Sequence, residues 1–569
     1  MIDIKVFAIE ITKHSTPCIT RKPNRNFIFA PVKFIFDLSR FMRIFATAIY
    51  HKFQLEVLQQ LKNKHSLSIA GATIFPPKDF KSADQALVQQ AELDHVFAEA
   101  ETFPLSLFYY PETIKQLKTV KTLPQSTLEA FKYLEALFYR TTDRANVFPI
   151  PIARKRRIYL KLLHFWFHKL KDLQIDYMIY FDTPHSFNGV IIAEVAKYFK
   201  IPALILEHTA LQDYSLIVKD WGIPALPNHY QQNQTRDALL CELPQDIQDT
   251  IEKKDGEDHE YLKWYKERDK KLNVSGGGLK ANLLLLMRFL KKAGFSIIRS
   301  SLSSLGLYNK RMLIEDVFLN NIRSEAKYRW KIIPSLYHQI KLNQYYNNLA
   351  QKEVNLEQPY IFFGMHVQPE KSSLPLGEEY DNQLLAIETI ADALEDGWFV
   401  YVKEHPAQFN LHRPTNGLFR SKHFYDRLAA HPKIKLLALD FDANILMRNA
   451  RFTSTITGTV GWESMLMGQP VLHFGKAYYT ACHAAFKIDS VESCKKAITE
   501  GSNMTREQVK KAVVQFIHYY LQNGHLIKAV NWETKFKYTS IDRSEQINTL
   551  TSAFAKRLLA QNAHSKMEE

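Results

Sequence analysis

Residues 453–475, "TSTITGTVGWESMLMGQPVLHFG", give the clearest indication of the fold. It reads as a β-branched strand, a Gly-Thr-Val-Gly turn, a short apolar helix and a second strand, which is the repeating unit of a parallel α/β sheet. A turn needs one glycine, yet this one carries Gly458 and Gly461, three hydroxyl residues nearby and a carboxylate, Glu463, just inside the helix. This surplus predicts that a ligand lies against the turn.

The same alternation extends upstream of the turn. Strands are predicted at "YIFFGMHVQ" (360–368), "WFVYVKEHP" (398–406) and "IKLLAL" (434–439), and helices at 381–397 and 443–450. Alternating strands and helices of this length are typical of a doubly wound, Rossmann-like domain.

The first half of the chain shows the same alternation of strands and helices. "DYMIYFDTPHS" (176–186) reads as a strand that ends in polar residues, a helix follows at 189–200, and "ALILEHT" (203–209) reads as the next strand. We therefore predict an α/β chain with two Rossmann-like, doubly wound domains that face a cleft.

The length of 569 residues suits two or three domains. We predict an N-terminal Rossmann-like domain over 1–350 with helical additions and a charged insertion near 243–280, a C-terminal Rossmann-like domain over 351–530, and a helical segment over 531–569.

Two basic, apolar segments leave two interpretations open. Residues 27–53 read either as a buried helical pair or as a face that lies on a membrane, and 279–299 reads as an amphipathic helix that packs on the protein or touches a membrane surface.

The composition narrows the classes of partner. The net charge is +15, which favours anionic partners or else describes a solvated basic surface. Of the anionic partners, we expect phosphorylated small molecules and anionic lipid, and not nucleic acid. The four cysteines lack metal or disulfide spacing, which fits a reducing compartment. No signal peptide and no run of about 18 apolar residues is visible, so a cytoplasmic protein is expected.

Candidate residues for binding a nucleotide-sugar donor, called donor-side residues, follow the predicted strands of the C-terminal domain. The carboxyl ends of these strands share one edge of a parallel sheet. The glycines would let a backbone approach a phosphate at the helix start, whose free N–H groups attract anions. Lys403 and His405 would add charge and hydrogen-bond donors. The candidate donor-binding residues are His366, Gln368, Lys403, His405, Thr457, Gly458, Thr459, Gly461 and Glu463.

Structural alternatives remain open for this set. Thr457 or Thr459 could cap the helix, Glu463 could complement its dipole, and the His405-Pro406 pair could only form a turn. No Walker A motif and no G-x-G-x-x-G is present, so the pattern excludes a P-loop NTPase and a common NAD enzyme.

The candidate catalytic residues are Asp182, His185 and Glu207, which follow the two strands of the first half. A carboxylate there could act as base for an acceptor hydroxyl, or as nucleophile. The alternatives are a helix N-cap for Asp182 and a buried, paired loop carboxylate for Glu207. Asp440-Phe441-Asp442 has the spacing of a metal-binding motif, but we interpret it as a loop and N-cap and predict no metal and no cofactor.

"YIFFGMHVQPEKSSLP", "YVKEHP" and "TGTVGWESMLMGQPVLHFG" resemble the bacterial capsule polysaccharide biosynthesis proteins, which include capsule Kdo transferases. The resemblance covers roughly 355–480, and it implies a GT-B fold with the nucleotide bound mainly by the C-terminal domain. It also implies that His405-Pro406 corresponds to the motif that contacts the nucleotide phosphate in CMP-sugar transferases, which favours a CMP-linked acidic sugar such as Kdo.

The expected function is therefore a glycosyltransferase at the cytoplasmic face of the inner membrane, with a nucleotide sugar as donor and a lipid-linked or growing oligosaccharide as acceptor. Peripheral contact with anionic lipid is expected from the charge. Two alternatives stay open: a non-catalytic glycan-binding or assembly protein that keeps a GT-B shell, and an epimerase-like enzyme that acts on a free nucleotide sugar.

Overall fold

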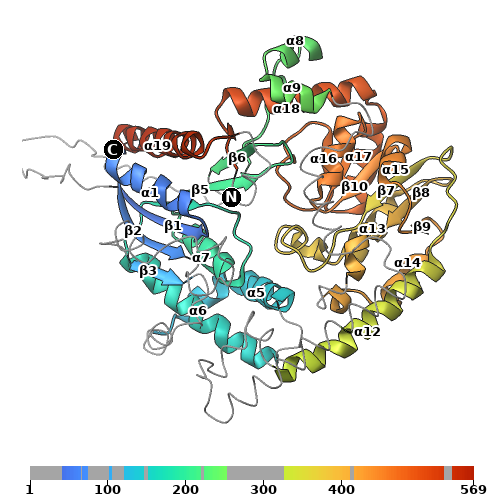
Figure 1. The fold of residues 1–569 in the computed structure, drawn as a ribbon, viewed down its shortest axis with the longest axis horizontal. Coiled ribbons are helices and arrows are strands. Elements are labelled where there is room, and N and C mark those ends of the chain that lie inside the picture. The colour runs from blue at the N-terminus through green and yellow to red at the C-terminus, as the bar shows by residue number, and fades with distance from the viewer. Residues whose placement is uncertain are drawn as a thin grey trace, which may run out of the picture. The chain divides into compact units, whose positions relative to one another are not determined.

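The computed structural model describes residues 42–65, 67–74, 101–104, 121–145, 151–219, 223–252, 287, 326–410, 416–530 and 541–568. All of them belong to one compact unit, Phe41–Glu569. Within it, the strands form two separate sheets (Figure 1).

The first sheet has seven strands in the order β13-β6-β5-β4-β1-β2-β3. β3, β2, β1, β4 and β5 pair in parallel, while β6 pairs antiparallel with both β5 and β13. The strands are β1 (Arg43–Ile49), β2 (Ser68–Ile74), β3 (Glu101–Pro104), β4 (Tyr177–Tyr180), β5 (Ala203–His208), β6 (Tyr214–Lys219) and β13 (Leu526–Lys528).

Helices cover both faces of this sheet, because successive strand residues point to opposite sides. One face packs on α1 (Lys52–His65) and α19 (Arg543–Glu568), the other on α5 (Lys132–Ala145), α6 (Ile152–Asp172) and α7 (Phe187–Tyr198). The sheet and these helices are called the first lobe. The shorter helices of this part of the chain are α4 (Gln125–Ala130), α8 (Arg236–Cys241) and α9 (Gln245–Ile251).

The second sheet has six strands in the order β12-β11-β10-β7-β8-β9, and all pairs are parallel. The sheet and its helices are called the second lobe. Its strands are β7 (Tyr360–Gly364), β8 (Phe399–Lys403), β9 (Ile434–Leu437), β10 (Phe452–Thr455), β11 (Val471–His473) and β12 (Ala485–Lys487).

The second lobe is doubly wound. Ile361 and Phe363 face a core shared with α12 (Ala326–Leu349), α13 (Gln383–Ala393), α14 (Lys422–Ala430) and α17 (Val491–Ser502), whereas Tyr360 and Phe362 face α15 (Ala443–Asn449). Helix α16 (Thr459–Leu466) joins the core that holds α18 (Arg506–Gln522). Short 3-10 turns are η6 (Glu378–Asp381), η7 (Pro406–Phe409) and η8 (Asn416–Phe419).

After the second sheet, the chain returns to the first lobe. β13 extends the first sheet beside β6, and α19 packs against α1, next to which it is drawn in Figure 1. The first lobe therefore contains residues that precede the second lobe in the sequence and residues that follow it.

The predicted fold class is confirmed, since the described chain is α/β with two mainly parallel, helix-covered sheets. The helical interpretation of 27–53 is wrong in its last part: residues 43–49 form β1, a central strand between β2 and β4, and residues 27–41 lie outside the described ranges. The predicted helix at 279–299 also lies outside them, apart from residue 287. In the predicted insertion, residues 245–251 form α9 and residues 253–280 are not among those described.

Candidate functional site

Three neighbouring parallel strands, β10, β7 and β8, end at one edge of the second sheet. The loop after β7 carries His366 and Gln368, β8 ends at Lys403 and leads into His405, and the turn after β10 spans 457–461. The structure thus brings the predicted donor-side residues to a single edge.

His366 holds the glycine turn in place. Its Nε2 accepts a hydrogen bond from Thr457 N at 3.2 Å and lies 2.9 Å from Thr455 Oγ1, which itself accepts from Gly458 N at 3.1 Å. Burial and the nearby Arg420 charge lower the pKa of His366 to about 4, so the ring is neutral at pH 7. Because Nε2 accepts, the ring proton lies on Nδ1.

No threonine caps α16. Its N-cap is Gly458, which has no side-chain cap, while the Thr457 hydroxyl donates to the Ser372 carbonyl at 2.5 Å. Thr459 is the exposed first helical residue, and Glu463 lies beyond the first turn, half-buried. The capping alternatives for Thr457 and Thr459 and the dipole-partner alternative for Glu463 therefore do not describe this helix, whose N-cap residue makes no side-chain cap hydrogen bond.

The two glycines are required by the protein's own packing. A Cβ at Gly458 would lie 2.7 Å from Thr455 Oγ1, and one at Gly461 would lie 2.5 Å from the hydroxyl of Tyr479. That hydroxyl donates to the Gly458 carbonyl at 2.6 Å. Gly461 is buried, so its lack of a side chain serves the packing on Tyr479 and opens no space at the surface.

His405 and Lys403 supply the polar groups after β8. The turn interpretation of His405-Pro406 holds in part, because His405 Nδ1 accepts from Ala407 N at 3.1 Å and caps η7. The same bond places the ring proton on Nε2, which makes that nitrogen a donor. Burial lowers the pKa of the half-buried Lys403 despite the opposing effect of nearby carboxylates.

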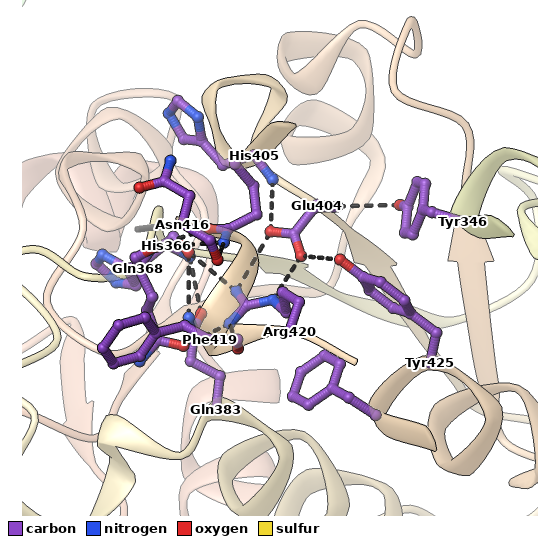
Figure 2. Close-up of polar contacts among 12 residues, drawn as sticks. Tyr346, His366, Gln368, Gln383, Glu404, His405, Asn416, Phe419, Arg420 and Tyr425 are labelled. Atoms are coloured by element: carbon purple, nitrogen blue, oxygen red, sulfur yellow. Dashed lines mark hydrogen bonds and ion pairs between the residues drawn. The ribbon is translucent and has the colours of Figure 1, made fainter. Parts of the chain in front are cut away.

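Glu404, the residue before His405, forms a buried ion pair (Figure 2). Arg420 Nε is 2.7 Å from Glu404 Oε2 and Nη2 is 3.3 Å from Oε1, and neither side chain is exposed. The Tyr425 hydroxyl donates to Glu404 Oε2 at 2.7 Å, and His405 N donates to Oε1 at 3.0 Å. Although burial lowers the pKa of Arg420, the Glu404 carboxylate outweighs this effect and the net pKa is raised.

Arg420 also reaches the loop after β7. Its Nη1 donates to Gln368 Oε1 and its Nη2 donates to the His366 carbonyl at 3.1 Å, as Figure 2 shows. One guanidinium therefore fixes the ends of β7 and β8 relative to each other. Sequence reasoning missed Arg420, because nothing in its local spacing marks it as the partner of Glu404.

Asp182 follows β4 at the corresponding edge of the first sheet and is 2% exposed. Its Oδ1 accepts a hydrogen bond from Lys371 Nζ at 2.8 Å, and its Oδ2 lies 3.5 Å from His185 Nδ1. Burial raises the pKa of Asp182, but the charges of Lys371 and His185 outweigh it and hold the pKa below its ordinary value. Ser186, not Asp182, is the N-cap of α7, so the capping alternative for Asp182 is wrong.

Glu207 is placed differently from the prediction. It lies inside β5 rather than after it, because β5 and β6 form an antiparallel pair in which Glu207 is opposite Leu216. It is half-buried and lies in a strand, so the alternative of a buried loop carboxylate does not describe its position. β4 and β5 are parallel neighbours, so Asp182 and Glu207 lie toward the same edge. Lys371, the partner of Asp182, was not predicted.

Within the described ranges, no group of three or more His, Cys, Asp or Glu side chains is placed to hold a metal ion. Asp442 caps α15, accepting from Asn444 N at 2.8 Å. Among the helices of the same ranges, none is long and apolar enough to cross a bilayer.

The family model described as capsule polysaccharide biosynthesis protein matches residues 328–483. This segment runs from α12 to the loop after β11 and contains every donor-side candidate, so the resemblance predicted from the sequence is confirmed there. No curated protein sequence matches the chain.

Solved structures with some similarity include two KpsC enzymes of Thermosulfurimonas dismutans. The beta Kdo 2,7 transferase is 11% identical, with 38% of this chain and 61% of that chain covered and a TM-score of 0.21. The beta Kdo 2,4 transferase is 13% identical, with 59% and 79% covered and a TM-score of 0.24. The chain thus spans less than two thirds of the first enzyme's length.

UDP-GlcNAc 2-epimerase from Methanocaldococcus jannaschii is 13% identical, with 84% of this chain and 100% of that chain covered and a TM-score of 0.21. At TM-scores this low, the superpositions add nothing to the fold and the site described above.

Proposed function

We propose that the chain is a glycosyltransferase of capsule or surface polysaccharide synthesis, which takes a sugar from a nucleotide donor and transfers it to a lipid-linked or growing glycan. The observation that carries the proposal is the meeting of three strand ends at the β10-β7-β8 edge, inside the segment that matches the capsule family model.

The chemistry at this edge suits a leaving nucleotide phosphate. The first N–H groups of α16 carry the positive end of its dipole, His405 Nε2 is a donor, and Lys403 adds a cation. Groups of this kind stabilise the negative charge that develops on a phosphate as the glycosidic bond breaks. We favour a CMP-linked acidic sugar such as Kdo, on the resemblance of His405-Pro406 to the motif of CMP-sugar transferases.

Asp182 is the proposed catalytic carboxylate. Its lowered pKa keeps it ionised, the form that a nucleophile toward the donor carbon or a base toward an acceptor hydroxyl requires. His185 and Glu207 are proposed to assist at the same edge of the first sheet. The enzyme is proposed to work at the cytoplasmic face of the membrane, on a nucleotide sugar and a glycan acceptor.

The experiment is a nucleotide-release assay with purified protein, a panel of CMP-, UDP- and GDP-sugars, and glycolipid or oligosaccharide acceptors. His405→Ala should lower turnover about 100-fold, the order of one lost transition-state donor. The matched control is His423→Ala, an exposed histidine of α14. The proposal fails if the wild type turns over no nucleotide sugar or if His405→Ala equals it. Interconversion of the donor without acceptor would indicate an epimerase, and nucleotide binding without turnover a non-catalytic protein.

A further inference from the structure

A cavity of about 230 Å³ lies in the second lobe beside Gln368. It is partly open to solvent, and its walls come from the loop after β7, the start of α13 and the segment from η8 to α14. The residues that line it are Gln368, Pro369, Ser373, Leu374, Asp381, Asn382, Phe419 and Phe424. None of them except Gln368 was among the predicted site residues.

The size of the cavity limits its occupant. Sites for whole drug-sized ligands span about 300–1,000 Å³, so the part of a ligand that this pocket holds has about the size of a single ring with its substituents.

The apolar part of the wall contains two aromatic rings. Phe419 and Phe424 are half-buried, and the Arg420 guanidinium lies 4.8 Å from the centre of the Phe424 ring. An aromatic face carries negative charge density and attracts the weakly positive C–H groups of a saturated ring. Leu374, which is buried, and Pro369 complete this wall.

Two polar residues of the wall are already committed to the protein. Gln368 Oε1 accepts from Arg420 and Nε2 donates to the Asp381 carbonyl, so both ends of its amide are used. The Ser373 hydroxyl donates to the Glu370 carbonyl at 3.2 Å. These groups shape the cavity, and recognition is left to Asp381 and Asn382.

Asp381 and Asn382 present an acceptor next to a donor. Asp381 Oδ2 is 3.0 Å from Arg140 Nη1, which makes the pair neutral overall. Asn382 Oδ1 accepts from Leu384 N at 3.3 Å as the N-cap of α13, so its amide addresses a ligand by donation from Nδ2. A carboxylate beside an amide N–H group matches two neighbouring hydroxyls, each of which donates and accepts.

We propose that this cavity binds one neutral, hydroxylated sugar ring. This inference rests on the proposed function: a neutral ring belongs to the acceptor glycan if the donor sugar is acidic, and to the donor if the donor sugar is neutral.

The test uses Asn382→Ser. Serine is as good an N-cap as asparagine, so α13 keeps its cap while the amide donors are lost. Phe419→Leu removes an aromatic face and keeps an apolar wall. Ser490→Asn, an N-cap exchange on α17 outside the cavity, is the control. Binding of methyl α-glucopyranoside and methyl α-galactopyranoside is measured by saturation-transfer NMR and calorimetry, with and without CMP.

Asn382→Ser and Phe419→Leu should each weaken glycoside binding about three- to tenfold, the effect of one lost hydrogen bond or ring contact. CMP affinity and Ser490→Asn should stay at wild-type values. A CMP-sugar that loses affinity in Asn382→Ser while CMP does not assigns the ring to the donor; loss of oligosaccharide affinity alone assigns it to the acceptor.

The proposal is overturned if the wild type binds neither glycoside, if both cavity variants bind like the wild type, or if CMP itself loses affinity in Asn382→Ser, which would indicate a nucleobase site. The glycoside readout does not use turnover. If glycoside binding responds as expected and no nucleotide sugar is turned over, the cavity stands and the proposed function falls.

Discussion

Replacement of Arg420 by methionine tests whether the buried ion pair organises the donor-side edge. Neither Arg420 nor Glu404 has an exposed side chain, so the variant leaves a carboxylate in the interior that still accepts from the Tyr425 hydroxyl and the His405 N–H but has lost its cation. Removal of one partner of a buried pair costs about 3–5 kcal/mol. The double variant with Glu404→Gln removes both charges and should cost less than the sum of the single variants, by about 2 kcal/mol.

The assay is urea unfolding read by hydrogen exchange of the β7 and β8 amides, because a chain with two lobes need not unfold in one step. Arg427→Met is the matched control: Arg427 pairs with Glu388 but its side chain is 55% exposed, so the cost should stay below about 1 kcal/mol. The reasoning is refuted if Arg420→Met costs no more than this control, or if the double variant is additive.

Two further changes test other contacts of the edge. Lys371→Met removes the ammonium group that outweighs the effect of burial on Asp182, so the pKa of that carboxyl should rise. The cost in stability should be largest at pH 7 and should shrink as acid protonates Asp182, which thermal unfolding from pH 7 to pH 4 measures. A cost that does not depend on pH would contradict this assignment. Gly461→Ala places a methyl group 2.5 Å from the Tyr479 hydroxyl and should lower the free energy of unfolding, measured with denaturant, by about 1–3 kcal/mol. Adding Tyr479→Phe to this variant should restore part of that free energy. If it restores none, the clash with the Tyr479 hydroxyl is not the cause of the loss.

The sign of the Lys371→Met prediction follows from linkage. In the wild type the pKa of Asp182 is lowered, so the stability that this carboxylate contributes is present above its unfolded-state pKa and is lost as the pH falls through the folded-state pKa. In the variant the pKa is raised, so protonation favours the folded state and the difference from wild type narrows on acidification.

The second lobe could be predicted from the sequence because its signals are local. Tyr360–Gly364 and its neighbours are short apolar runs with helices between them, and the carboxyl ends of parallel strands must share an edge. The meeting of His366, His405 and the 457–461 turn follows from that topology alone.

What the sequence did not predict depends on contacts between distant residues. β13 is a three-residue edge strand that pairs with the six-residue β6 some 300 positions earlier in the chain, and no local sequence pattern indicates this pairing. Arg420 pairs with Glu404 across a loop, and Lys371 meets Asp182 across 189 positions. The glycines were predicted to make room for a ligand, but Tyr479 and Thr455 already require them.

The late return of the chain to the first lobe has a consequence for the order of synthesis. β7 to β12 lie within residues 360–487, so the second sheet can pair as soon as that stretch has left the ribosome. The first sheet has to wait, because β6 gains its outer neighbour only with residues 526–528 and α1 is covered only by α19. A nascent chain that has completed the second sheet therefore still exposes the Ile217 and Leu58 side of the first, which makes this lobe the place where a chaperone would be engaged longest.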